Sequence, residues 1–523
     1  MSLPKETIRA LESIVGPQYV SEDPVVCQVY ARGGYGKDIV LGRGNLKPAC
    51  VVLPGSTEEV QSIVKLANRY KTPFVPVGTF WFNSCGPYRE NVISIDLKRM
   101  NKIEIDDRNM YAVCEPYVIF SQLQHEAMKR GLYMMVPGGG AQVSVVNNVT
   151  GAGYSPLNYR IGGPQRRILG VEWVMPDGEI LKLGSASMLK EYFWGEGPGP
   201  DLRGILRGPQ GWQGGLGIFT KAAVKLYPFQ PERLVPTGIS PDTTLELPTK
   251  RMRRYNITYP DQPSLVKAMR EVSKAEIGAA ITKVPVMWRY RARSTSKEHF
   301  WELWKGAKED LQKNTETILL VVIIGYTSEK QVEYEERVLT DIVTETGGTL
   351  RRTKQTDESW IKNADSAGMW WSAGGYISVK INVDSLDHAL KSGRDAAALK
   401  KKYLEGAVDD YGDPGWFQIS SFGHEGYNEF LVEFDATSDP KVSHRIDNFY
   451  VDAVKQDVKE GCYSGMQMSY GPVGITGPAY GDHHILLKEI KEMFDPGYLS
   501  NPPRPFEFDE KIERECPWVK KDW

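Results

Sequence analysis

The sequence has few cysteines, and their arrangement would not build a metal or disulfide site. Six cysteines are scattered through 523 residues, and no two of them form a C-x-x-C pair. We therefore expect no disulfide scaffold, structural zinc site or cysteine-ligated cluster. The longest apolar run, ILLVVIIGY at 318–326, is far shorter than the ~20 residues that span a bilayer. It predicts a buried strand instead.

Neither sign of charge is in excess. Lys and Arg total 64 against 66 Asp and Glu, which disfavours nucleic acid or an anionic membrane surface as a partner. The N-terminal segment MSLPKETIRALESIVG predicts an amphipathic helix rather than the apolar part of a signal peptide. These features lead us to expect a soluble, cytoplasmic protein. Because the length exceeds that of one ordinary core, we expect two or more domains.

Two glycine-containing loops follow short strands in the N-terminal half. A strand at 51–53 ends at Pro-Gly, and Ser56 and Glu59 form a capping box for a helix with apolar residues at helical spacing. A second strand at 74–77 runs into Gly78. The segment MVPGGGAQVSVVNNVTGAGYSP at 135–156 supplies the other loop, whose glycines let a ligand approach the backbone. Two such loops suit a cofactor pyrophosphate held by backbone amides. The usual G-x-G-x-x-G fingerprint is missing, which argues against a nicotinamide cofactor.

These loops belong to a longer ordered series of motifs. LKRMNKIEID follows the first unit, and GVEWVMPDGEIL at 170–181, GGLGIFTKAAVKLYP at 214–228 and FDPGYLSNP at 494–502 follow the second loop. In this order the motifs resemble the FAD-binding domain of the vanillyl-alcohol oxidase and p-cresol methylhydroxylase flavoprotein family. The resemblance implies an α+β fold, with a two-part FAD-binding domain of the p-cresol methylhydroxylase type and an antiparallel-sheet cap covered by helices. We expect the FAD-binding domain at 1–235, the cap at 236–458 and a returning segment at 459–523.

The cap region has its own pattern of strands and long helices. Strands are predicted at RRYNITY, at ITKVPVMWRYRA and at 318–326, with helices at 263–280, 296–314 and 328–348 between and after them. A strand pair is expected in GWFQISSFGHEGYNEFLVEFDAT, and a helix at 438–458. This alternation predicts an antiparallel sheet with helices on one face.

The resemblance also assigns a set of residues to FAD. They are Pro76, Val77, Gly78, Asn83, Ser84, Pro137, Gly138, Gly139, Gly140, Ser144, Asn147, Asn148, Gly151, Gly217, Ile218, Tyr376 and Asn501. The first loop departs from the family, because it has no histidine for a covalent bond and carries bulky residues at 80–82. That loop is either part of the pyrophosphate site or a plain turn.

Three residues are candidates for chemistry. Tyr154 stands where relatives have an active-site tyrosine. Tyr376 follows Gly374-Gly375 at a position where relatives bond the flavin covalently, although an ordinary strand tyrosine is the alternative. Alternation puts His424 on one strand face and Tyr427 and Glu429 on the other. His424 is either a base or substrate hydrogen-bond partner, or a core histidine.

Several family groups are missing. An acidic residue near the flavin ring is replaced by Val136-Pro137, and the Tyr-Arg pair that holds a phenolate is replaced by Gly465 and Met466. The segment around His424 loosely resembles half of a metal site in glycolate and D-lactate dehydrogenases. The other half is absent, so no metal is expected. Arginines at 289, 291 and 293 would share one strand face, as solvated charges or as contacts to an anionic substrate.

These features predict an FAD-dependent oxidoreductase acting on a small molecule. We expect removal of a hydride from a C–H next to oxygen or an aromatic ring, with electrons passed to a partner protein or to O2. A glycolate or D-lactate type 2-hydroxyacid dehydrogenase is the first alternative. A weakly catalytic flavin-binding subunit of a larger complex is the second. Either a homo-oligomer or a subunit of a complex is expected.

Overall fold

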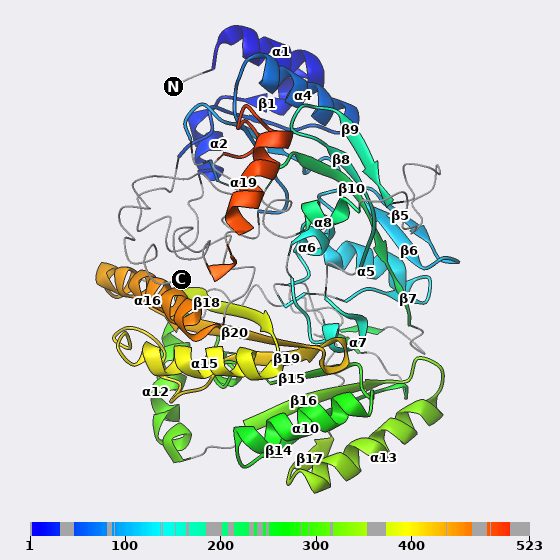
Figure 1. The fold of residues 1–523 in the computed structure, drawn as a ribbon, viewed down its shortest axis with the longest axis vertical. Helices are drawn as coiled ribbons and strands as arrows, with labels where there is room; N and C mark the ends of the chain where they lie inside the picture. The colour runs from blue at the N-terminus through cyan, green and yellow to red at the C-terminus, as the bar shows by residue number, and fades with distance from the viewer. Residues whose placement is uncertain are drawn as a thin grey trace.

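The computed structural model describes most of the chain. The described residues are 3–31, 46–80, 86–87, 89–135, 137–138, 140–151, 153–163, 167–184, 201–207, 214–229, 235–237, 244–246, 250–283, 285–291, 293–313, 317–352, 373–435, 437–462, 479–481 and 483–502. They form two lobes. The N-terminal half makes up the upper lobe, and the lower lobe consists of a large sheet with its helices (Figure 1).

The predicted strand–helix–strand unit is confirmed and forms the first sheet. Ser56 accepts a hydrogen bond from the Glu59 N–H, while the Glu59 carboxylate accepts one from the Gly55 N–H rather than from Ser56. The apolar side of the helix is buried against the sheet and against the N-terminal helix. Strands β2, β4 and β3 are parallel, and β1 pairs antiparallel with β2. The elements are α1 (Lys5–Val15), η1 (Pro17–Tyr19), β1 (Val20–Ser21), α2 (Pro24–Val29), β2 (Cys50–Val52), α4 (Thr57–Arg69), β3 (Phe74–Val77) and β4 (Ile93–Asp96).

A second, antiparallel sheet completes the upper lobe. Its order is β5-β6-β10-β8-β9, and its core is centred on the fully buried Trp173 and Phe120. A two-stranded pair, β7 with β11, lies at its lower end (Figure 1). The elements are β5 (Ile103–Asp106), β6 (Tyr111–Cys114), α5 (Phe120–Met128), β7 (Leu132–Tyr133), α6 (Val145–Thr150), α7 (Asn158–Ile161), β8 (Ile168–Val174), β9 (Ile180–Leu183), α8 (Arg203–Leu206), β10 (Ile218–Lys225) and β11 (Tyr227–Pro228).

The lower lobe is built on a seven-stranded antiparallel sheet of order β17-β14-β16-β15-β19-β20-β18. One face is buried by α10, α13, α15 and α16, as the apolar clusters on these helices and strands show. The predicted sheet with helices on one face is therefore confirmed. The elements are β12 (Val235–Thr237), β13 (Thr244–Glu246), β14 (Met252–Tyr259), α10 (Gln262–Lys274), β15 (Ala280–Lys283), α11 (Met287–Arg291), α12 (Lys297–Lys313), β16 (Thr317–Ile324), α13 (Glu329–Glu345), β17 (Thr349–Arg352), β18 (Gly375–Asp384), α15 (Leu386–Lys400), β19 (Trp416–Ser420), η6 (Ser421–Gly423), β20 (Glu425–Phe434) and α16 (Pro440–Glu460).

The strand predicted through ITKVPVMWRYRA is wrong in its second half. The strand ends at Lys283, and Met287–Arg291 form the short helix α11. Pro285 lacks the N–H that a central strand needs, so the ladder cannot continue through it. Arg289 and Arg293 are exposed and Arg291 is buried, so the three arginines do not line a strand face together.

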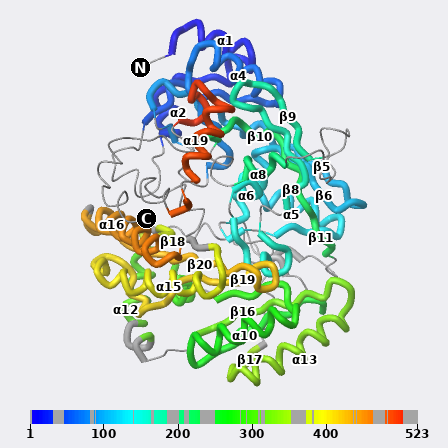
Figure 2. Tube along the Cα trace, viewed as in Figure 1, coloured from blue at the N-terminus to red at the C-terminus, as the bar shows by residue number. Residues whose placement is uncertain are grey.

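The C-terminal segment returns to the upper lobe. Helix α19 (His483–Phe494) lies beside the first and second sheets, red against blue and cyan in Figure 2. Phe494 packs on Trp173 with ring centroids 5.5 Å apart, and Ser500 forms a parallel bridge with Phe74. Among the described residues, no helix has the length and apolar content needed to cross a membrane. The four cysteines that the structure describes are free and buried.

Candidate functional site

The first predicted loop lies against helix α6. A Cβ added to Gly78 would come within 2.9 Å of the Asn147 amide nitrogen, so a larger residue would displace that side chain. Asn147 is in the first turn of α6, where the Ser144 hydroxyl accepts a hydrogen bond from its N–H. The Ser144 hydroxyl also donates to the Pro116 carbonyl at 2.6 Å, which fixes the helix start. The structure therefore brings Gly78, Ser144 and Asn147 together.

The second loop is closed by backbone hydrogen bonds. The Gly140 N–H donates to the Pro137 carbonyl at 2.9 Å, and the Gly138 N–H donates to the Tyr154 carbonyl at 2.7 Å. Gly140 has a φ of 111°, a conformation that favours glycine. At the end of α6, the Gly151 N–H donates to Asn147. This loop therefore places Tyr154 directly beside Gly138.

The tail completes the same region. The Ser500 hydroxyl donates to the Gly214 carbonyl at 2.7 Å and accepts from the Gly217 N–H at 2.8 Å. The Asn501 N–H donates to the Phe74 carbonyl at 2.7 Å, next to the strand that ends in Pro76–Gly78. A Cβ on Gly214 would meet Pro76 at 2.3 Å. The turn that contains Gly217, the tail at Asn501 and the strand that contains Pro76 are therefore joined, although they lie far apart in the sequence.

A buried lysine supports this junction. Lys491 of α19 is fully buried, and its ammonium donates to the Gly215 and Ser500 carbonyls and pairs with Asp495 at 2.6 Å. The Asp495 carboxylate in turn accepts the N–H groups of Leu499 and Ser500. The helix thus holds both the tail and the 214–217 turn. Val77 and Ile218 are buried apolar residues of β3 and β10, and they contribute to the core.

The residues present fit an FAD cofactor. The Asn148 side-chain oxygen is buried and has no hydrogen-bond partner, although it lies in the helix that follows the glycine loop. The loops at Gly78 and Gly138 have no room for a Cβ, so their backbone lies close to neighbouring groups. Backbone amides, glycines and a helix start at loop tips are the groups that bind a pyrophosphate.

An aromatic wall, formed by Tyr427, Trp416 and Trp288 of the lower lobe, faces the glycine loop and Tyr154. The Tyr154 ring stacks on Tyr427 with centroids 4.3 Å apart, and Tyr427 packs edge-on against Trp416 at 5.3 Å. Trp288 of α11 extends the wall, 5.6 Å from Trp416. A Cβ on Gly138 would meet the Trp416 ring at 2.5 Å. The wall and the loop are therefore in direct contact.

The polar groups of the wall are fixed by hydrogen bonds. The Tyr427 hydroxyl donates to Glu429 Oε2 at 2.6 Å, and the Ser378 hydroxyl donates to Glu429 Oε1. The Trp416 indole N–H donates to the Thr282 hydroxyl at 2.7 Å. These side chains project from the sheet face opposite to the four covering helices, because strand residues alternate between faces. They can hold a polar substrate group next to the aromatic rings.

Two cations close to the wall are committed to buried ion pairs, whereas the buried guanidinium of Arg167, which interacts electrostatically with Tyr154, has no hydrogen-bond partner among the described residues. Arg291 pairs with Glu433 at 2.6 Å, and both side chains are buried. Burial raises the pKa of the Glu433 carboxyl, although Arg291 opposes this shift. Lys283 pairs with Asp413, whose other oxygen accepts the Val286 N–H just before α11. These pairs fix α11, and with it Trp288, against the sheet.

The remaining predicted residues lie elsewhere or outside the described residues. His424 is exposed at the β19–β20 turn, and the structure does not bring it to Tyr154. The Tyr376 backbone opens β18 and pairs with Glu433. The Tyr376 side chain lies outside the described part of the structure. So do Asn83, Ser84, Val136, Gly139, Gly465 and Met466.

Sequence reasoning missed Trp416, Tyr427, Glu429 and Ser378. The alternation in the segment GYNEF did separate Tyr427 and Glu429 from the other strand face. The pattern did not say which face meets the cofactor loop, and that depends on which face the helices cover.

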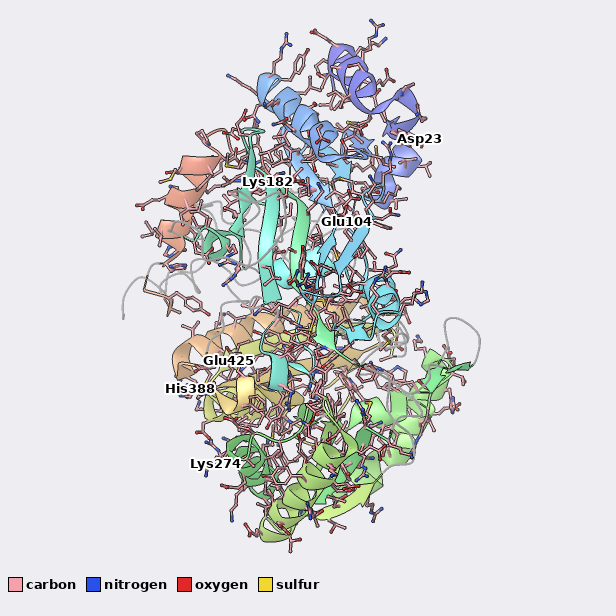
Figure 3. The ribbon with its side chains drawn as sticks, turned by 90° about the vertical axis from the view of Figure 1, so that its right-hand side faces the viewer. Asp23, Glu104, Lys182, Lys274, His388 and Glu425 are labelled. Atoms are coloured by element: carbon pink, nitrogen blue, oxygen red, sulfur yellow. The ribbon has the colours of Figure 1, made fainter. Side chains whose placement is uncertain are left out.

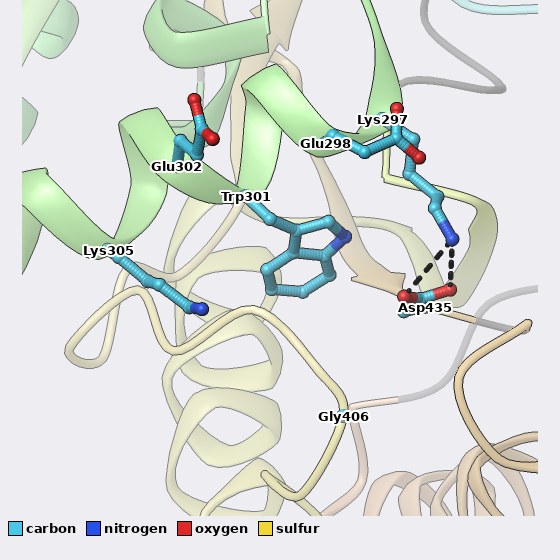
Figure 4. A pocket seen from close by; sticks show the side chains of 7 residues that line it. All are labelled: Lys297, Glu298, Trp301, Glu302, Lys305, Gly406 and Asp435. Atoms are coloured by element: carbon cyan, nitrogen blue, oxygen red, sulfur yellow. Dashed lines mark hydrogen bonds and ion pairs between the residues drawn. The ribbon is translucent and has the colours of Figure 1, made fainter.

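A separate pocket of about 480 Å³ lies along α12 (Figure 4). Its lining includes Lys297, which is paired with Asp435 at 3.1 Å, and Trp301, which donates to the Ala373 carbonyl. The pocket lining contains none of the residues of the aromatic wall. We do not assign it to the cofactor site.

Comparison with known proteins agrees with this geometry. Residues 48–184 match the family model of an FAD binding domain. The hydroxylating 4-cresol dehydrogenase flavoprotein subunit of Pseudomonas putida is 30% identical over 195 residues, 35% of this chain and 36% of that protein. A glycolate oxidase subunit of Bacillus subtilis is 30% identical over 187 residues, 35% of this chain and 37% of that protein. The match thus spans little more than a third of the length of each curated relative.

The similarity of the fold extends over nearly the whole chain. A crystal structure of p-cresol methylhydroxylase with substrate bound superposes with a TM-score of 0.72 at 18% identity, covering 96% of both chains. The fold is therefore that of p-cresol methylhydroxylase, and FAD is the cofactor of its N-terminal domain. In its FAD-binding region and in its fold, the chain is thus similar to FAD-linked oxidoreductases that include 4-cresol dehydrogenase and p-cresol methylhydroxylase.

Proposed function

We propose that this protein is an FAD-dependent oxidoreductase that removes a hydride from a C–H next to oxygen or an aromatic ring of a small molecule. The observation that carries the proposal is the contact between the glycine loop at Gly138 and the aromatic wall at Trp416. A substrate held by that wall lies next to the loop assigned to the cofactor. Bound FAD supplies the acceptor for the hydride and its two electrons.

The chain's own residues bind and orient the substrate. Tyr154 and Tyr427 offer stacked rings, and Trp288 and Trp416 complete an apolar surface that favours an aromatic or alicyclic ring. The same rings exclude water from the reacting carbon. We assign residues 1–235 and 459–523 to the FAD-binding domain and 236–458 to the cap that carries the wall.

The cations near the wall differ in how they are neutralised, which bears on the substrate. Arg291 and Lys283 are each neutralised by a buried carboxylate, whereas the buried guanidinium of Arg167, which interacts electrostatically with Tyr154, has no hydrogen-bond partner among the described residues. A phenolate would need a cation to stabilise it. Because Gly465 and Met466 stand in place of the Tyr-Arg pair that holds a phenolate in the family that the sequence resembles, we expect an aromatic alcohol or related hydroxylated molecule to be a better substrate than p-cresol.

The proposal is tested by anaerobic mixing of the purified flavoprotein with a panel of alcohols, 2-hydroxy acids and alkylphenols. Bleaching of the flavin by an aromatic or alicyclic alcohol is the expected result. Bleaching by lactate or glycolate alone, lost on treatment with a chelator, would favour the hydroxyacid dehydrogenase alternative. A flavin that dithionite reduces but no panel member reduces would contradict the proposal and favour the flavin-binding subunit.

The electron acceptor is the second part of the proposal. We infer that a partner protein receives the electrons in preference to O2. The relative in Pseudomonas putida is named as a flavoprotein subunit, which supports this inference. After anaerobic bleaching, admission of air is expected to restore the colour slowly, and an artificial one-electron acceptor is expected to restore it fast. Immediate reoxidation by air would identify an oxidase.

We also propose that Tyr376 is bonded covalently to the flavin. Its backbone opens β18, in the sheet that carries the aromatic wall, and follows Gly374 in a turn with φ of 101°. Precipitation of the protein in acid is expected to give a yellow pellet, which becomes colourless in Tyr376→Phe. The exposed Tyr334→Phe serves as the control. Free FAD in the supernatant of the unmodified protein would refute the bond.

A further inference from the structure

An alcohol that loses a hydride must also lose its hydroxyl proton. This requirement follows from the proposed function, because a carbonyl product forms only when both the C–H and O–H bonds break. A site that performs the reaction therefore needs a proton acceptor next to the bound hydroxyl group. The wall offers one in the hydrogen-bonded pair of Tyr427 and Glu429.

The geometry of this pair suits proton transfer. The Tyr427 oxygen lies 2.6 Å from Glu429 Oε2, which is within the reach of a direct transfer. The Tyr427 side chain is 3% exposed, with its ring in contact with Tyr154 and Trp416. Glu429 is only partly buried, so its carboxylate can later exchange a proton with water. The Ser378 hydroxyl holds the second carboxylate oxygen.

We propose that Glu429 is the proton acceptor of the reaction and that Tyr427 carries the proton to it. The substrate hydroxyl gives its proton to the Tyr427 oxygen as the Tyr427 proton passes to Glu429. FAD, when bound, would accept the C–H hydrogen with both electrons of its bond, so that the substrate carbon and oxygen form a carbonyl. Glu429 ends protonated and Tyr427 ends neutral. The charge and the electrons therefore balance, and water takes the proton from Glu429 after turnover.

Three cations on elements of the cap are paired with carboxylates, whereas Arg167, buried just before β8 and near Tyr154, has no hydrogen-bond partner among the described residues. Lys283 of β15 is paired with Asp413, and Lys297 of α12 is paired with Asp435. Arg291 of α11 is paired with Glu433, which lies in β20 together with Glu429. The Glu429 carboxylate lies on the wall beside the Tyr427 hydroxyl. A carboxylate in this position repels an anionic substrate. The inference therefore names the substrate class as a neutral alcohol with a ring.

The test compares anaerobic flavin reduction by a neutral aromatic alcohol in three variants. Glu429→Gln is expected to slow reduction about 100- to 10,000-fold and to remove the fall in rate toward acid pH. Tyr427→Phe is expected to slow it over the same range, because the relay oxygen is gone. Glu425→Gln, at the first residue of the same strand and labelled beside His388 in Figure 3, is expected to match the unmodified protein. The FAD content and the rate of reduction by dithionite should not change in any variant.

The outcomes separate this inference from the proposed function. If no alcohol reduces the unmodified protein, the proposed function fails. If an alcohol reduces it and Glu429→Gln keeps both the rate and the pH profile, only the proton-acceptor role is overturned. If Glu429→Gln does not fold, the rate of flavin reduction in Tyr427→Phe tests the proton transfer instead, because this variant keeps the Glu429 carboxylate and removes the hydroxyl that carries the proton. A Tyr427→Phe variant with unchanged rate and unchanged solvent isotope effect would overturn the relay.

Discussion

Gly138 is the residue at which the cofactor loop and the cap sheet touch. A Cβ there would lie 2.5 Å from Trp416 Cη2 and 3.3 Å from the Tyr154 carbonyl oxygen. We predict that Gly138→Ala destabilises the protein by about 1–3 kcal/mol through overpacking and lowers its FAD content. Thermal unfolding and the flavin-to-protein absorbance ratio after gel filtration measure the two effects.

The control for this change is Gly306→Ala in helix α12. No heavy atom lies within 4 Å of a Cβ at Gly306, so the change should stabilise the helix by about 0.5–1 kcal/mol. Equal stability and equal FAD content in Gly138→Ala and the unmodified protein would show that the loop and Trp416 do not form a tight contact.

Asp447 in α16 gives a prediction on pH dependence. Burial raises the pKa of its carboxyl to about 6, and His444 only partly opposes the shift. Because the folded pKa lies above the unfolded value, the stability contribution is present below pH 4 and is lost as the pH rises through 6. Asp447→Asn should therefore raise the melting temperature at pH 8, by about 2–4 °C, and change it little at pH 4. The exposed Asp341→Asn should have little effect at either pH, and an equal effect of Asp447→Asn at both would contradict the shift.

At the residue scale, the sequence identified the cofactor loops better than the substrate wall. Gly78, Gly138, Asn147 and Asn501 were predicted because their residue types and order resemble a known family, and the structure brings them to one region. The wall depends on which sheet face is left uncovered. Alternation alone does not decide this question, because it divides a strand into two faces without distinguishing them.

Helix α19 is the element that attaches the tail to the cofactor region. Replacing Lys491 by Met would leave the buried Asp495 without its cation and the Gly215 and Ser500 carbonyls without their donor. We predict a loss of about 3–5 kcal/mol in the free energy of unfolding, together with weaker retention of FAD.

The matched control is Lys488→Met, one turn earlier in the same helix. Lys488 is largely exposed and lies 3.7 Å from Glu492, a surface pair whose loss should cost less than about 1 kcal/mol. Chemical denaturation of both variants gives the comparison. Similar losses for the two lysines would contradict the role assigned to the buried one.

Most elements were predictable from periodicity, and the exceptions have local causes. The long helices and the strand at 317–324 follow the apolar spacing of their sequences. Helix α11 was mistaken for a strand because the alternation of MWRYR also fits a short helix turn next to Pro285. The turn at His424 contains Ser421 and Phe422 with φ values of 51° and 53°, a conformation that these residue types do not predict.

At the scale of the whole molecule, the two lobes share one site. The N-terminal lobe supplies the loops and Tyr154, the cap supplies Tyr427 and Trp416, and the tail holds the first lobe together through Ser500. The order of the seven cap strands and their register could not be read from the sequence. They depend on pairings between segments more than a hundred residues apart, such as β15 with β19.

The central claim is that a C–H bond of a neutral alcohol, held against Tyr154 and Tyr427, delivers its hydrogen to the flavin. The most direct test is the rate of anaerobic flavin reduction by an aromatic alcohol that reduces the flavin, compared with the same alcohol deuterated at the carbinol carbon. We predict a several-fold slower reduction with the deuterated alcohol, which shows that this C–H bond breaks in the measured step. Bound FAD that dithionite reduces, but that no neutral alcohol reduces with either isotope, would contradict the claim.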